Sequence, residues 1–229
     1  MNEMTEKRVV ILFVKLPEKG KVKSRLAQRV DQDLVLRLYK NMVLDTIDML
    51  TRGRFPFRIF FTPPGARYQI VEWLGPEHPS VPQTGDGLGD RMEGAFACVF
   101  NEEVEEILLI GSDIPGLTTE VIEEAFTALL TSDAVIGPAY DGGYYLIGFR
   151  KRSFEPDIFR DMAWSTGTVF RETMDKLHDA SLKVHVLQEL MDVDTVEDLK
   201  TLMCQVKRPA SEALRTRTFL EQHCKDILK

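Results

Sequence analysis

The chain has 229 residues, of which 44% are hydrophobic and 28% charged, and a formal net charge of −7. This length predicts one large domain or two small ones, and the composition is ordinary for a globular protein and excludes disorder over the whole chain. The acidic balance argues against a general nucleic-acid binder, which needs a basic face to neutralise phosphates. Three scattered cysteines are too few for a disulfide framework or a structural zinc site, and an odd count suits a reducing cytoplasm.

The start of the chain carries charged residues that lead into an apolar run of only six residues, Val9–Val14. This run is too short for the core of a signal peptide with a small-residue cleavage site, and far too short to span a bilayer. No other apolar stretch approaches membrane length. We therefore expect a cytoplasmic protein that has neither a membrane nor a nucleic acid as its partner.

Short apolar runs bounded by Gly, Pro and Asp predict the strands. Continuous rather than alternating apolar runs are typical of strands that are buried on both faces. The predicted strands are Val9–Val14, Arg58–Thr62, Glu106–Ile110, Ala134–Gly137, Tyr144–Phe149 and Val184–Leu187. Because helical patterns alternate with these strands, the sequence predicts an α/β fold with a mostly parallel sheet.

The helical patterns begin with an amphipathic stripe that includes Leu38 and Met42. Gly53 stands where a glycine at the C′ position would end this helix. Further helices are predicted at Asp90–Phe100, Thr119–Leu130 and Thr168–Asp179. The stretch Pro209–Lys229 is predicted as one more helix with its proline in the first turn. This last helix either closes the core of the domain or packs on a second subunit.

The first candidate site follows the first strand, because ligands of open α/β sheets bind beyond the carboxyl ends of the strands. From Lys15 to Arg29 the chain holds six basic residues and one acidic residue, a local charge of +5. A loop with Gly20, several cations and a following helix N-terminus suits a polyphosphate, because backbone N–H groups and ammonium groups both attract the anion. The alternative is a solvated basic loop. It is not a Walker A loop, because Val22 stands where Ser or Thr is needed.

Two aspartates that follow later strands are candidate metal ligands. Asp113 comes just after a buried strand, between Gly111 and Pro115, and is well placed to bind a hard cation. The alternative is a turn aspartate that bonds its own backbone. Asp194, with Glu197 three residues later, fits a helix N-cap with a capping-box partner. One carboxylate can serve as a cap and as a metal ligand, and spacing alone favours the cap for Asp194.

Three further stretches could contact a substrate. Asp141 precedes two glycines, so it could orient a substrate hydroxyl or act as a base, and the alternative is a hairpin-type turn. Gln83 and a glycine-rich stretch lead into a helix, with Asp90 as its N-cap and Arg91 as a substrate contact. Trp164 precedes another helix, either as a lid or as a contact with the core. The four histidines show no metal-ligand spacing and are expected to be structural or on the surface.

Six motifs in this order together resemble the nucleotide-diphospho-sugar transferase superfamily of GT-A fold. They are KLPEKGKVKSRL, Gln83 with GLGDRM, GSDIPGL, DGGYYLIG, Trp164-Ser165 and DVDTVEDL. The branch that they resemble most is the family labelled radical-SAM/selenodomain-associated transferase 1. The first motif is also similar to that of 2-phospho-lactate guanylyltransferase, and the last motif to those of sugar nucleotidyltransferases. The resemblance covers about residues 8–203.

The resemblance implies a three-layer α/β/α fold with a mostly parallel mixed sheet. Residues 1–203 would form the transferase domain and residues 204–229 a C-terminal helical extension. A nucleotide would bind at the first half of the sheet, with Mg²⁺ or Mn²⁺ at Asp113 and Asp194, and this match places the metal interpretation of Asp194 above the cap. The glycine-rich loop of the activated-sugar synthases is replaced here by a lysine-rich loop, which alters the usual cradle for base and phosphate.

The favoured hypothesis is a metal-dependent transferase that passes a nucleotidyl group from a nucleoside triphosphate to a phosphorylated or hydroxylated small molecule. A triphosphate suits the basic loop because it brings more charge than a sugar diphosphate. The candidate catalytic residues are Asp113, Asp141 and Lys23, and the candidate nucleotide- or phosphate-binding residues are Lys15, Gly20, Lys23, Arg25, Gln83, Gly87 and Arg91.

Two alternatives to nucleotidyl transfer stay open. The first is a glycosyltransferase with a nucleotide-sugar donor, in which Asp141 is the candidate base. The second is a nucleotide-binding module without catalysis, which would keep Lys23 and Arg25 functional but would not need the metal. A homodimer is also left open.

Overall fold

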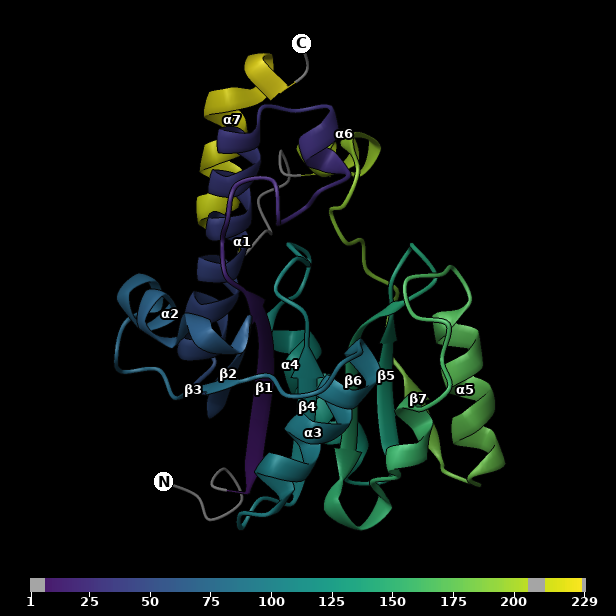
Figure 1. Ribbon diagram of the computed structural model, residues 1–229. Coiled ribbons are helices and arrows are strands. Elements are labelled where there is room, and N and C mark those ends of the chain that lie inside the picture. The colour runs from purple at the N-terminus through teal and green to yellow at the C-terminus, as the bar shows by residue number, and fades with distance from the viewer. Residues whose placement is uncertain (1–6, 206–212, 228–229) are drawn as a thin grey trace.

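A seven-stranded sheet forms the centre of the molecule (Figure 1). The computed structural model of the chain describes residues 7–205 and 213–227. The strands are β1 (Arg8–Lys15), β2 (Phe57–Thr62), β3 (Ser80–Pro82), β4 (Glu106–Ile110), β5 (Ala134–Pro138), β6 (Tyr144–Arg150) and β7 (Val184–Val186). Their order in the sheet is β3-β2-β1-β4-β6-β5-β7. Strand β6 runs antiparallel to both of its neighbours and the other pairs are parallel, so the predicted mostly parallel mixed sheet is confirmed.

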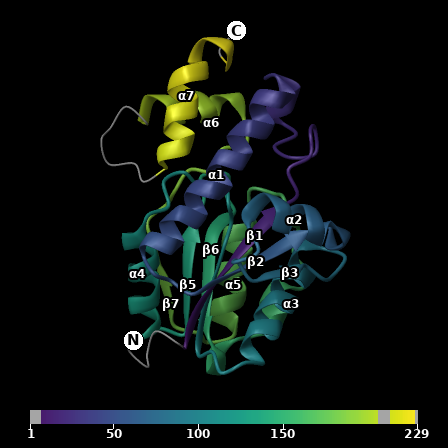
Figure 2. The ribbon, with the colours of Figure 1, turned by 90° about the vertical axis from the view of Figure 1, so that its left-hand side faces the viewer.

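Helices cover both faces of the sheet (Figures 1 and 2). The helices are α1 (Gln32–Arg52), α2 (Arg67–Leu74), α3 (Leu88–Phe100), α4 (Thr119–Leu129), α5 (Val169–Asp179), α6 (Val196–Gln205) and α7 (Leu214–Ile227). Short 3-10 turns lie at Leu26–Gln28, Pro64–Ala66, Lys151–Ser153 and Pro156–Phe159. Helices α6 and α7 lie beyond one end of the sheet, beside the far half of α1 (Figure 1).

Each face of the sheet carries its own apolar core, because consecutive side chains of a strand point to opposite faces. Val10 and Leu12 of β1 are buried in a core shared with α1, α2, α4, α6 and α7. Val9 and Ile11 are buried in a second core, shared with α3 and α5. Both faces are therefore covered, which explains the continuous apolar sequence of the strand and confirms the expected three-layer α/β/α architecture.

All six predicted strands are present within one or two residues of their expected bounds. The sequence analysis missed β3, which has only three residues, and α2, which has only eight. Gly53 follows the last residue of α1 as predicted, but its φ is −70°, outside the left-handed region that a C′ glycine adopts. A Cβ at this position would meet the ring of Phe55 at 2.2 Å, so close packing requires the glycine.

Helix α7 joins the core of the domain along α1. Its Phe219 and Leu220 are buried in the same core as α1. Asp45 of α1 binds the start of α7, because the backbone N–H groups of Arg215 and Thr216 donate to its two carboxylate oxygens at 2.9 and 2.8 Å. The core-closing interpretation of the C-terminal helix is thus confirmed for residues 214–227. The predicted start at residue 209 lies outside the described residues, and the division into two units at residue 203 stays a prediction.

One edge of the sheet gathers the loops that the sequence analysis singled out. The parallel strands β1, β4, β5 and β7 all end there, and because β6 is antiparallel, it begins there. The loops that follow β1, β4, β5 and β7 therefore meet at one edge, and the loop after β5 leads directly into β6. Ligands of open α/β sheets bind at such an edge. In the part of the chain that the structure describes, no helix is both long and apolar enough to cross a membrane.

Candidate functional site

A cavity of about 540 Å³ opens at this edge of the sheet. It is lined by the end of β1, by the loops that follow β1, β4, β5 and β7, and by the start of β6. The predicted site residues among its lining are Lys15, Lys23, Gln83, Arg91, Asp113, Asp141 and Asp194. Three other predicted residues, Gly20, Arg25 and Gly87, lie outside the lining. The fold thus brings together residues that are up to 179 positions apart in the sequence.

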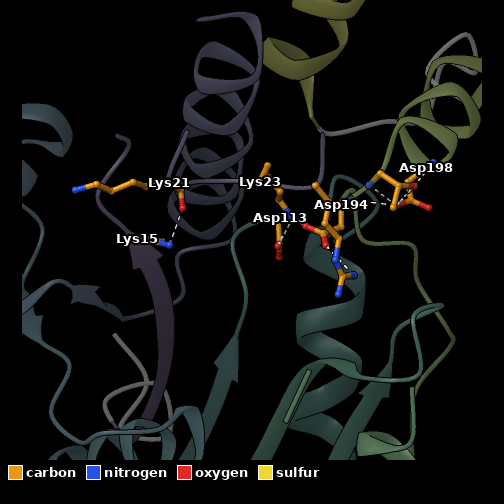
Figure 3. Close-up of polar contacts among 8 residues, drawn as sticks. Lys15, Lys21, Lys23, Asp113, Asp194 and Asp198 are labelled. Atoms are coloured by element: carbon orange, nitrogen blue, oxygen red, sulfur yellow. Dashed lines mark hydrogen bonds and ion pairs between the residues drawn. The ribbon is translucent and has the colours of Figure 1, made fainter. Parts of the chain in front are cut away.

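An ammonium group lies between the two predicted metal ligands. The Nζ atom of Lys23 is 2.5 Å from Oδ2 of Asp113 and 3.6 Å from Oδ1 of Asp194 (Figure 3). The lysine side chain is only 6% exposed, and the two aspartate side chains are about one-third exposed. The carboxylates come from the loops after β4 and after β7, so neither loop alone forms this arrangement.

The charge of Lys23 is stabilised by its carboxylate neighbours. Burial opposes the charged form of the side chain, but the nearby carboxylates, with Asp113 first among them, outweigh burial and raise the pKa of the ammonium group. The residue has a φ of 47°, in the left-handed region that few residues other than glycine adopt. The loop therefore holds Lys23 in an uncommon backbone conformation while its side chain reaches the two carboxylates.

Asp194 is not the N-cap that its spacing favoured. Helix α6 begins at Val196, and the reciprocal capping bonds join Thr195 and Asp198: the Thr195 N–H donates to Oδ2 of Asp198 at 2.7 Å, and the Asp198 N–H donates to Oγ1 of Thr195 at 3.2 Å (Figure 3). Because Thr195 and Asp198 cap the first turn of α6, the carboxylate of Asp194 is not needed there and lines the cavity instead. Its Oδ2 atom also accepts a hydrogen bond from Arg25 at 3.3 Å.

The basic loop is folded back onto the end of β1. Nζ of Lys15 donates to the backbone oxygen of Lys21 at 2.6 Å (Figure 3), and Gly20 makes the intervening turn with a φ of 75°. The hydroxyl of Tyr39 in α1 donates to the backbone oxygen of Lys15 and accepts from its N–H group. Burial raises the pKa of Tyr39 to about 12, so the tyrosine stays protonated and able to donate. In the sequence, Tyr39 belongs to the same amphipathic stripe as Leu38 and Met42, and nothing there distinguishes it from a core residue.

The helix that follows the basic loop does not offer a free N-terminus. Asp31 is the N-cap of α1, and its carboxylate accepts from the N–H groups of Asp33 and Leu34 at 2.9 and 3.1 Å. Because these two N–H groups are bonded within the chain, they are not free to attract an anion. Binding of a phosphate by the basic loop itself stays a prediction.

The glycine-rich stretch before α3 contributes one side of the cavity. Gln83 is buried and donates to the backbone oxygen of Phe60 at 2.8 Å. Helix α3 begins at Leu88, so Asp90 lies in its first turn and is not the N-cap that was expected. The Asp90 carboxylate accepts from the N–H of Gly87 at 2.9 Å, so that N–H is already bonded. Arg91 lines the cavity, and its Nε atom donates to a backbone oxygen at 3.2 Å.

Asp141 lies in the turn between β5 and β6, which confirms the hairpin interpretation and also places the residue in the cavity. Its Oδ1 atom accepts from the N–H of Gly143 at 2.8 Å. Gly142 has a φ of 85°, and a Cβ there would meet the backbone oxygen of Gly167 at 2.2 Å. The two glycines therefore serve both a turn and a close backbone approach. Trp164, from the neighbouring loop, also lines the cavity.

Asp192 is a cavity residue that the sequence analysis did not select. It lines the cavity two positions before Asp194. Burial raises its pKa to about 6, and the negative charge of Asp141 adds to the shift while Lys23 opposes it. The signal in the sequence was the alternation of Asp192 and Asp194, which places two carboxylates on the same side of an extended segment.

The two carboxylates at Lys23 fit a nucleotide-dependent cation site. Within residues 7–205 and 213–227, no group of three or more His, Cys, Asp and Glu side chains could hold a metal ion. Mg²⁺ usually keeps several waters and is bound by one or two carboxylates together with substrate phosphates. Asp113 and Asp194 already converge on one positive group, so their oxygens suit a cation whose remaining ligands come from a substrate and water.

The three-layer fold, together with a solved structure of this class that is 38% identical over 97% of the chain, places the protein in the nucleotide-diphospho-sugar transferase superfamily. The chain belongs to the DUF2064 family, described as an uncharacterized protein conserved in bacteria, and the match covers residues 46–166. No curated protein matches the sequence.

Solved structures support the same class. A candidate nucleotide-diphospho-sugar transferase from Desulfovibrio desulfuricans G20 is similar with a TM-score of 0.91 and 38% identity, over 97% of each chain. A cytidylyltransferase from Leptospira borgpetersenii has a TM-score of 0.59 and 12% identity, over 96% of each chain. A protein from Mycobacterium tuberculosis H37Rv, in complex with manganese, has a TM-score of 0.50 and 17% identity, over 86% of this chain and 97% of that one. The last two similarities concern the fold alone.

Proposed function

We propose that the protein transfers a nucleotidyl group from a nucleoside triphosphate to a hydroxyl or phosphate of a small molecule, with a divalent cation held by Asp113 and Asp194. One observation carries the proposal: a single cavity holds four cationic side chains and four carboxylates, and two of these carboxylates converge on one of the cations. The cationic side chains are Lys15, Lys21, Lys23 and Arg91. A triphosphate needs many positive groups, and the carboxylates supply the anionic ligands that a divalent cation needs.

Similar structures support both parts of the proposal. The Leptospira protein with this fold is a cytidylyltransferase, and the mycobacterial protein with this fold was solved with manganese. Mg²⁺ or Mn²⁺ would supply neutralisation of the charge that develops on the phosphate oxygens. We therefore assign the phosphates of the substrate to the side of the cavity formed by the loop after β1.

The residues of this chain would bind and orient both reactants. Lys15, Lys23 and Arg91 bind phosphate oxygens, which positions the α-phosphorus and stabilises negative charge. An oxygen of the acceptor attacks the α-phosphorus, the bond from that phosphorus to the bridging oxygen breaks, and pyrophosphate leaves. Where the acceptor is a hydroxyl, its proton passes to Oδ2 of Asp141, the oxygen that is not bonded to Gly143.

Glycosyl transfer is the second candidate function, and the position of Asp141 favours it. An exposed carboxylate in the cavity suits a base that activates an acceptor hydroxyl for attack on the sugar carbon, after which a nucleoside diphosphate leaves. The two functions differ in product. Nucleotidyl transfer releases pyrophosphate from a nucleoside triphosphate, and glycosyl transfer releases a nucleoside diphosphate from a nucleotide sugar.

A thermal-shift panel tests the proposal. The protein is heated with each nucleoside triphosphate, nucleoside diphosphate and nucleotide sugar, with and without Mg²⁺ or Mn²⁺, because a ligand of the native state raises its stability. We expect a metal-dependent shift with one triphosphate, followed by pyrophosphate release when acceptors are added. Asp113→Asn should lose the metal-dependent part of the shift, and Asp175→Asn, on the exposed side of α5, should retain it.

Other results of the panel contradict the proposal. A shift that occurs only with a nucleotide sugar or its diphosphate would favour glycosyl transfer. A different result would be a nucleotide-induced shift that does not depend on metal and is the same in Asp113→Asn as in the unmodified protein. That result would favour a nucleotide-binding module without catalysis.

A further inference from the structure

The ammonium group of Lys23 occupies the place between the carboxylates where the proposed cation would be bound. Its Nζ atom is 2.5 Å from Asp113 and 3.6 Å from Asp194, and its side chain is almost fully buried. Other cations around the cavity are bonded elsewhere: Lys15 to a backbone oxygen of the loop, and Lys21 to Glu18. Lys23 is thus distinguished from them by its partners and its burial.

An ammonium group and a divalent cation cannot share these two oxygens. Mg²⁺ binds oxygen at about 2.0–2.1 Å in a nearly octahedral shell, and Nζ of Lys23 already lies 2.5 Å from the Asp113 oxygen. Two positive groups at such a separation repel strongly in a partly buried site. Binding of the cation therefore requires that Lys23 leave its present position.

We propose that Lys23 acts as a built-in substitute for the cation in the nucleotide-free protein, so that the cation binds tightly only after nucleotide phosphates draw the lysine away from Asp113 and Asp194. This inference rests on the proposed function and adds an order of binding to it. A lysine suits this role because its charge lies at the end of four flexible methylene groups, so it can exchange a carboxylate for a phosphate without a change of backbone.

The proposal implies that the same residue has opposite effects on two ligands. Lys23 lowers the affinity of the empty protein for a divalent cation, because it competes for the carboxylates. It raises the affinity for a polyphosphate, because it is attracted to the anion. If Lys23 only stabilised the conformation of the loop, its substitution would change the affinities for cation and polyphosphate in the same direction, or would change neither.

Direct measurement of Mn²⁺ binding without nucleotide tests this competition. Free Mn²⁺ is measured by electron paramagnetic resonance while the protein is titrated. We expect Lys23→Met to bind Mn²⁺ at least about tenfold more tightly than the unmodified protein, a difference of about 1.4 kcal/mol. Lys21→Met is the matched control, because it removes the same charge from the same loop at a residue that is bonded to Glu18, and we expect a change below about twofold.

The variants also separate this inference from the proposed function. If the unmodified protein and Lys23→Met bind Mn²⁺ equally tightly, and Asp113→Asn abolishes the binding, the cation site exists and the competition does not. If no form binds Mn²⁺, even with the triphosphate selected in the thermal-shift panel, the metal-assisted function itself fails. Circular dichroism establishes that each variant is folded, and Lys23→Gln and Lys23→Ala repeat the test if the methionine variant is not.

A second measurement tests the same competition with Lys23 intact. Inorganic tripolyphosphate is titrated by calorimetry in the presence of EDTA, so that no metal takes part. Asp113→Asn releases Lys23 and should bind the probe about tenfold more tightly than the unmodified protein. Asp141→Asn removes an equal charge from the same cavity but no contact of Lys23. Equal gains in the two variants would overturn the proposal, because charge alone would then explain them.

Discussion

Two carboxylates of this chain are held by partners of different kinds. Asp45 of α1 is 5% exposed and accepts two backbone N–H groups at the start of α7. Asp113, at the edge of the sheet, is paired with the ammonium group of Lys23. The backbone donors are fixed by the helix, whereas the lysine is the end of a flexible side chain. The first partnership therefore serves stability, and the second can be exchanged when a ligand enters.

The largest expected effect is the loss of turnover when Asp113 is changed. Asp113→Asn keeps the shape of the side chain but removes the charge that the proposed cation needs. We expect pyrophosphate release to fall by about 10³-fold or more, the order of magnitude found when electrostatic stabilisation of a transition state is removed. The free energy of unfolding, measured in urea, should change far less than it does in Asp45→Ala. A variant with normal turnover would remove Asp113 from the reaction.

The second-largest expected effect is a loss of stability when Asp45 is changed. Asp45→Ala leaves two N–H groups at the start of α7 without their acceptor, so we expect the free energy of unfolding to fall by about 2–3 kcal/mol. Asp48→Ala is the control, because its ion pair with Arg215 is solvent-exposed and should contribute less than about 1 kcal/mol. Urea unfolding measures both. Equal losses in the two variants would mean that the exposed ion pair contributes as much as the backbone bonds, which would contradict the prediction.

The sequence predicted the regular elements of the fold better than the local geometry of the site. Strands and long helices follow from apolar periodicity, so β1, β4 and α1 were predicted, and Asp113 was found because it follows a buried strand. The residue that caps each helix was harder to predict. Spacing favoured Asp194 and Asp90 as caps, yet α6 begins one residue later and α3 three residues earlier than these caps require. A shift of one residue decides which side chain is left for the cavity.

Contacts between segments that are far apart in the sequence could not be predicted from residue patterns. Nothing in the order of residues shows that Lys23 lies between Asp113 and Asp194, because Lys23 is 90 positions from the first and 171 from the second. The bond between Tyr39 and the backbone of Lys15 is equally hidden, since a tyrosine in an apolar stripe looks like a core residue. Such contacts depend on how the sheet edge brings several loops together.

The third and smaller expected effect is a loss of nucleotide affinity when cations of the basic loop are removed. Lys23→Ala and Arg25→Ala should each weaken nucleotide binding, by roughly 1–3 kcal/mol for the loss of a charge-assisted hydrogen bond. The loss should be larger for Lys23, which lines the cavity, than for Arg25, whose side chain is 64% exposed. Calorimetry with the nucleotide measures both. Unchanged affinity in both variants would remove the loop from the binding site.

The smallest expected effect is a pH dependence of stability that comes from Asp45. Burial raises the pKa of this carboxyl above its ordinary value of 3.8, against the opposing effect of its hydrogen bonds to Thr216 and Arg215. As the pH rises through the window between the ordinary and the raised pKa, the unfolded chain releases this proton before the folded protein does, so the contribution of Asp45 to stability decreases. Above that window the contribution is constant.

Asp45→Asn isolates this titration, because asparagine has a similar shape and no proton to release. We expect the free energy of unfolding of the unmodified protein, relative to Asp45→Asn, to be larger at about pH 4 than at about pH 7. The opposite slope would mean that the two N–H donors outweigh burial and lower the pKa. Asp45 would then be held in its charged form by the fixed dipoles of those two N–H groups.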